Sequence, residues 1–155
     1  MPTRTENGIK RKRTAYLKAM RAYDEKRGPM PHWGDYLVRP IAEALGSHLG
    51  PGYEVEVGTP MGLGARVSVT ITQREGPVDS RGKPPSAWFC FEPGQLSAGE
   101  IRLVDFSRIE HDYPPGSIGR INGLQHPSDP RPVLLDLLSR ARKQLAEARD
   151  DAEGA

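Results

Sequence analysis

One cysteine and four histidines are the residues of this chain whose types could support nucleophilic or metal chemistry. Cys90, His111 and Asp112 together supply the groups of a thiol nucleophile, in which a base takes the proton from the sulfur. Cys90, however, lies inside the apolar run Trp88–Phe91, which predicts a strand, and a buried thiol in a strand is usually inert. We therefore predict that the protein is not an enzyme. A small enzyme of unknown reaction that uses Cys90 and His111 is the third functional hypothesis.

The histidines do not form a metal-ligand pattern, because no two of them are spaced i, i+4, and a lone cysteine cannot build a thiolate zinc site. The glycine-rich stretch 58–64 looks like a phosphate loop at first sight. It lacks the Lys-Ser/Thr ending, and a predicted strand follows it where a phosphate loop has a helix. The sequence therefore predicts neither a metal nor a cofactor.

Alternating carboxylates at Glu54 and Glu56 could in principle do acid–base work. Alternation of this kind is also typical of the solvent-facing side of a strand. There, Arg66 and Arg102 on neighbouring strands could pair with these acids or with Glu92 across the sheet. We favour cross-strand pairing over catalysis.

Our first hypothesis is a non-enzymatic protein-interaction protein: a small adaptor, assembly component or inhibitor, such as an accessory protein of a phage or mobile element. Two apolar side chains, Met61 and Leu63, sit on the glycine-rich loop, and apolar loop tips can anchor in a partner's pocket. The predicted protein-binding residues are Met61, Leu63, Arg66 and Leu145.

Positive charge is concentrated near the N-terminus. Residues 1–30 hold nine Lys or Arg against three acids, whereas the remainder holds 13 against 17. The alternative function is therefore nucleic-acid binding through the basic face of a first helix, formed by Lys10, Arg11, Lys18 and Arg21. Tyr16 and Tyr23 share the apolar stripe instead of the basic face, which argues against base stacking. Electrostatic docking onto an acidic protein accounts for the charge equally well.

Periodicity predicts the elements that must position these residues. The expected class is α+β: two N-terminal helices, a four-stranded mainly antiparallel sheet, and a C-terminal helix packed on the sheet. We expect the first helix to begin after an Asn7 cap and the second to kink or start at Pro40. The expected ranges are helices 8–27, 34–49 and 130–150, strands 53–57, 65–72, 87–91 and 100–107, and an irregular stretch 108–132.

The length fits one domain over residues 1–155, with residues 1–7 and 151–155 as frayed tails. We expect a cytoplasmic protein, because there is one thiol, no apolar leader and no membrane-length apolar run. In the last helix the apolar stripe narrows to Ala141, Leu145 and Ala148. We therefore expect its second half to reach solvent, a partner or a second copy of the chain.

Overall fold

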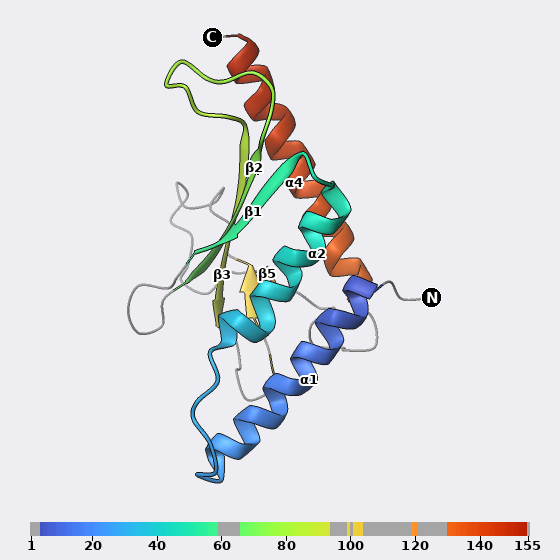
Figure 1. The fold of residues 1–155 in the computed structure, drawn as a ribbon, viewed down its shortest axis with the longest axis vertical. Helices are drawn as coiled ribbons and strands as arrows, with labels where there is room; N and C mark the ends of the chain where they lie inside the picture. The colour runs from blue at the N-terminus through green and yellow to red at the C-terminus, as the bar shows by residue number, and fades with distance from the viewer. Residues whose placement is uncertain are drawn as a thin grey trace.

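The computed structural model describes residues 4–58, 66–93, 99, 101–103, 119–120 and 130–154. Figure 1 shows the order of the elements along the chain. They are α1 (Arg4–Asp24), the π-helical turn η1 (Gly34–Val38), α2 (Arg39–Leu49), β1 (Tyr53–Val57), β2 (Val67–Gln73), β3 (Ser86–Pro93), β4 (Ile101–Leu103), β5 (Gly119–Arg120) and α4 (Arg131–Glu153).

The structure has two layers, with α2 and α4 packed against an antiparallel sheet of order β1-β2-β3-β4-β5, and with α1 packed mainly against η1 and α2 (Figure 1). The alternation of the strands explains this arrangement. Val67 pairs with Phe91, Val69 with Phe89 and Ile71 with Ala87, and all six side chains are buried. Because residues opposite each other in an antiparallel pair point to the same face, these pairs form one apolar surface for the helices to cover.

The α+β class, the antiparallel sheet and the C-terminal helix agree with the prediction, but the strand count of four does not. The described residues contain three longer strands, β1 to β3, and two short ones, β4 and β5. The fourth strand, expected over 100–107, is described only at Ile101–Leu103.

Both terminal helices are longer than predicted. The first begins at Arg4, so Asn7 lies inside it, and it ends at Asp24. The early start has a physical reason, since Glu6 in its first turn is only 3% exposed and lies 3.0 Å from Arg131 Nε. The last helix continues to Glu153 and Ala152 is buried, so the tail expected from residue 151 is helical. The predicted start at Pro40 is confirmed, because this proline lies in the first turn of α2, where its missing N–H costs nothing.

The second half of α4 does not overhang the sheet, which corrects the expectation for Leu145. Leu145 is only 1% exposed. Gln144 Oε1 accepts a hydrogen bond from the Trp88 backbone N–H at 2.8 Å, and Arg149 donates to Gln73 Oε1 at 3.0 Å. The hairpin of β2 and β3 is therefore long enough to hold α4 along most of its length.

Within the part of the chain that the structure describes, none of the helices is long and apolar enough to cross a membrane.

Candidate binding groove between two helices

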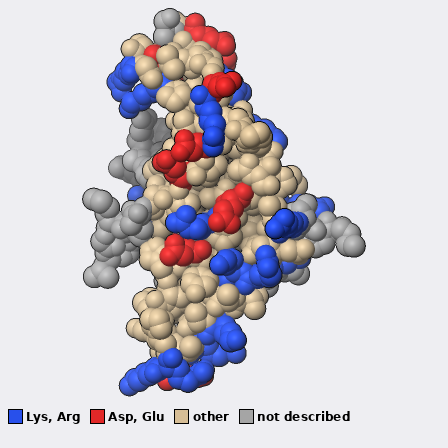
Figure 2. Space-filling view, in the orientation of Figure 1, with Lys and Arg blue, Asp and Glu red and all other residues tan. Residues whose placement is uncertain are grey.

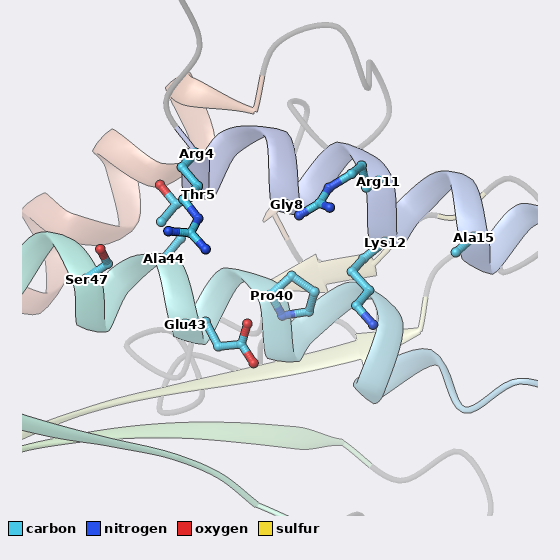
Figure 3. A pocket seen from close by; sticks show the side chains of 10 residues that line it. All are labelled: Arg4, Thr5, Gly8, Arg11, Lys12, Ala15, Pro40, Glu43, Ala44 and Ser47. Atoms are coloured by element: carbon cyan, nitrogen blue, oxygen red, sulfur yellow. The ribbon is translucent and has the colours of Figure 1, made fainter.

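A groove with a volume of ≈ 620 Å³ runs between α1 and α2 (Figure 3). One wall comes from each helix. The lining residues are Arg4, Thr5, Gly8, Arg11, Lys12, Ala15, Pro40, Glu43, Ala44 and Ser47.

Helical spacing places these residues in the groove. On α1, Arg4, Gly8, Arg11 and Ala15 follow the i, i+4, i+7, i+11 pattern that puts side chains on one face. Pro40, Glu43, Ala44 and Ser47 follow the same kind of spacing on α2. The groove is thus a product of two helix faces that turn toward each other.

Small side chains keep the groove open. Pro40 and Ala44 are buried and form its apolar floor. A Cβ atom added to Gly8 would meet nothing within 4 Å, so this glycine faces open space. A larger residue at Gly8 or Ala15 would occupy volume that is now accessible from outside.

The walls differ in charge. Arg4, Arg11 and Lys12 contribute three cations from α1, whereas α2 contributes the single acid Glu43. In Figure 3 the side chains of Arg4 and Lys12 extend from α1 toward α2. Figure 2 shows Lys and Arg gathered over α1. No ion pair among the described residues involves any of these four groups. The groove therefore has an excess of positive charge that can attract an anion.

The buried side of α1, next to the groove, fixes the helix in place. Tyr16 is fully buried, its ring centroid lies 5.9 Å from that of Tyr36, and burial raises its pKa to about 12. Within the described parts of the chain its hydroxyl has no hydrogen-bond partner. Lys12 Nζ lies 5.8 Å from the Tyr36 ring centroid, within range of a cation–π contact. One cation of the groove is thus positioned by an aromatic ring.

One of the four residues predicted to bind nucleic acid, Arg11, lines the groove. Lys18 lies two turns further along the same side of α1, and Lys10 and Arg21 lie beside that side. These three are not lining residues; Lys18 and Arg21 are exposed and Lys10 is half-buried. Tyr16, being buried, cannot stack on a base. Two groove cations, Arg4 and Lys12, are absent from the predicted set. The i+7 spacing puts Arg4 on the same face as Arg11, but it does not show that either lines a groove, and it gives no signal for Lys12.

The predicted protein-binding residues do not come together either. Met61 and Leu63 lie outside the described residues. Arg66 is exposed at the start of the β2 hairpin arm, with its Nε 3.6 Å from Glu92 Oε2, which confirms cross-strand pairing for this arginine. Leu145 belongs to the core and offers no surface in this structure.

Cys90 is only 4% exposed, and burial raises the pKa of its thiol, which disfavours the reactive thiolate. His111 lies outside the described residues. The described residues contain no group of three or more His, Cys, Asp or Glu side chains that could hold a metal ion.

A smaller hollow of ≈ 220 Å³ contains His32, Asp35 and Arg39. Asp35 Oδ1 lies 3.5 Å from Arg39 Nε, and Asp35 Oδ2 lies 3.9 Å from His32 Nδ1. All three side chains are about half exposed or more. The acid already has a cation beside it, so this hollow has less excess charge than the groove.

Comparisons of the chain with protein-family models, with curated proteins and with solved structures find no match. Function is therefore inferred from the chemistry of the groove between α1 and α2.

Proposed function

We propose that this protein is a non-enzymatic binding protein that holds an acidic helical segment of another protein in the groove between α1 and α2. The observation that carries the proposal is the pairing of three cations, Arg4, Arg11 and Lys12, with a floor of small apolar side chains. The single thiol of the chain supports the cytoplasm as its compartment.

Shape favours a helix as the occupant. An amphipathic helix commonly lays one face into a groove between two other helices, where its side chains fit between theirs. Small residues at Gly8, Ala15 and Ala44 allow close approach of a third backbone. An Ala-rich face of the partner would fit the floor, and its carboxylates would reach the rim.

Charge favours carboxylates as the recognised groups. Arg4 and Arg11 can each donate two hydrogen bonds to a carboxylate through the guanidinium, and charge-assisted hydrogen bonds of this kind are among the strongest. Glu43 on the facing wall adds selectivity, because it repels a strand of closely spaced phosphates more than a helix with separated acids.

The nucleic-acid alternative relies on Lys10, Arg11, Lys18 and Arg21, of which Arg11 alone lines the groove. Among the tyrosines of α1, only Tyr23 is exposed, and it is not a lining residue. A polyphosphate backbone would therefore meet three of its four predicted cations outside the groove.

The test is a titration of the full chain with two labelled probes, a helical peptide rich in Glu and Ala and a duplex DNA. The charge reversal Arg11→Glu with Lys12→Glu should weaken peptide binding at least about tenfold, because each lost charge-assisted contact contributes roughly 1.5–3 kcal/mol. Lys10→Glu with Arg21→Glu is the matched control, since it makes the same charge change outside the groove.

Equal loss of peptide binding in both variants would contradict the proposal, because simple net charge would then explain the affinity. Tight DNA binding that is lost in the control variant and kept in the groove variant would support the nucleic-acid function instead. The loop hypothesis makes a different prediction, namely that Met61→Asp with Leu63→Asp abolishes partner binding. If the groove is the binding site, this variant should leave the affinity for the peptide unchanged.

A further inference from the structure

The outer end of α4 has the opposite charge to the groove. Its last residues, 147–153, contain four acids and one base. The base, Arg149, donates a hydrogen bond to Gln73 and so points to the sheet. Figure 2 shows acidic side chains gathered at the top, where α4 ends. The acids of this segment, hereafter the acidic end, are Glu147, Asp150, Asp151 and Glu153, and all four are exposed.

Three acids of the acidic end share a helix face, because Glu147, Asp150 and Asp151 are spaced i, i+3, i+4. No ion pair among the described residues uses any of them. Ala146 and Ala148 lie beside this face and are half-buried. The acidic end therefore combines unpaired carboxylates with small side chains, the chemistry that the groove is suited to hold.

Helix dipoles add to the match. The groove begins at the first turn of α1, around Arg4 and Thr5, where the dipole is positive, and the acidic end lies at the C-terminus of α4, where the dipole is negative. The acidic end is also already helical, so binding does not have to order a flexible segment.

We propose that the groove of one copy of this chain receives the acidic end of α4 from a second copy. The inference rests on the proposed function, since it names one occupant of the same groove. Contact within one chain is ruled out by the fold, because the last turns of α4 extend away from α1 (Figure 1). Since groove and acidic end are different surfaces, two copies either exchange ends reciprocally or join head to tail.

The experiment is sedimentation velocity on the full-length protein over a concentration series at low and high salt. Wild type should self-associate at low salt and dissociate as salt screens the charges. The groove variant Arg11→Glu with Lys12→Glu and the end variant Glu147→Lys with Asp151→Lys should each weaken association at least about tenfold.

The decisive arm combines both reversals in one chain, because four substitutions then restore opposite charges on the two surfaces. Self-association should return in this combined variant. A second combination, Lys10→Glu with Arg21→Glu and the end reversal, has the same net charge but should remain dissociated. Thermal unfolding of every variant checks that the fold is kept.

Wild type that stays monomeric at low salt and high concentration overturns the inference. So does an end reversal that leaves self-association unchanged, or a combined variant that fails to recover it. The peptide titration separates this failure from that of the proposed function. If the end variant still binds the Glu- and Ala-rich peptide through Arg11 and Lys12, only the inference falls. If the groove variant binds the peptide as tightly as wild type does, the proposed function is contradicted as well.

Discussion

The two terminal helices have nearly the same length, 21 residues in α1 and 23 in α4, but they bury different kinds of residue. All seven buried residues of α4 are apolar, whereas α1 buries Glu6, Arg13 and the hydroxyl-bearing Tyr16 among its five. Apolar burial is the main source of folding stability. We therefore infer that α4 mainly stabilises the sheet, whereas the solvent-facing side of α1 lines the groove.

The largest expected effect on the free energy of unfolding comes from a core residue of α4. Leu145→Ala should lower the free energy of unfolding by about 2–5 kcal/mol, because it leaves a cavity in the core. Leu135→Ala, on the same helix but 60% exposed, is the matched control and should change it by less than about 0.5 kcal/mol. Denaturant unfolding measures both. Equal, small effects would show that α4 is loosely packed and would remove the contrast with α1.

The second effect concerns the polar burial under α1. Tyr16 holds its proton to about pH 12 when folded, whereas an unfolded tyrosine releases it near pH 10. The folded state thus binds more protons in this window, so the free energy of unfolding should fall by roughly 2–3 kcal/mol between pH 10 and 12. Tyr16→Phe should abolish this portion of the loss when stability is followed against pH. A wild-type profile that superimposes on the Tyr16→Phe profile would contradict the burial of the hydroxyl.

A smaller effect tests the link between the two helices. Arg131→Ala removes the cation 3.0 Å from the buried Glu6 carboxylate, and should cost about 1–3 kcal/mol because the acid stays buried. Arg140→Ala breaks an exposed i, i+4 pair with Asp136 and should cost no more than about 0.5 kcal/mol. Chemical denaturation of the two variants in parallel makes the comparison, and a reversed order would mean that Glu6 is solvated.

The smallest expected effect on stability comes from reversing two groove cations of α1. Arg11→Glu with Lys12→Glu should change the free energy of unfolding by less than about 1 kcal/mol, since both side chains are exposed and neither forms an ion pair with another described residue. The same variant should lose affinity for acidic helices. Calorimetric unfolding beside a peptide titration gives both numbers. A marked loss of stability would mean that these cations hold the fold and are not free for a ligand.

Periodicity predicted the α+β class, the antiparallel strands and the helix start at Pro40, because each depends on local spacing and turn residues. The burial of Leu145 could not be predicted in this way. It depends on how far the hairpin of β2 and β3 extends along α4, which is a tertiary contact. The start of α1 at Arg4 likewise depends on Arg131, 125 residues away from Glu6.

The groove was missed for a related reason. The sequence places basic residues around much of α1, and only the packing of α2 decides which of them share a cavity. Arg11 belongs to both the predicted basic face and the groove, whereas Arg4 and Lys12 become significant only once Pro40 and Ala44 are seen opposite them. The sequence therefore indicated that α1 is basic, and the packing of α2 against it showed which of its basic residues line the groove.

Chemical-shift mapping of the isotope-labelled full chain, titrated with the Glu- and Ala-rich helical peptide, tests the central claim most directly. If the peptide binds in the groove, the backbone amide signals of five lining residues should move together and saturate with one affinity. These residues are Gly8, Arg11, Ala15, Ala44 and Ser47. Shifts concentrated instead at Lys10 and Arg21, or around the exposed Trp88 on the sheet, would contradict it.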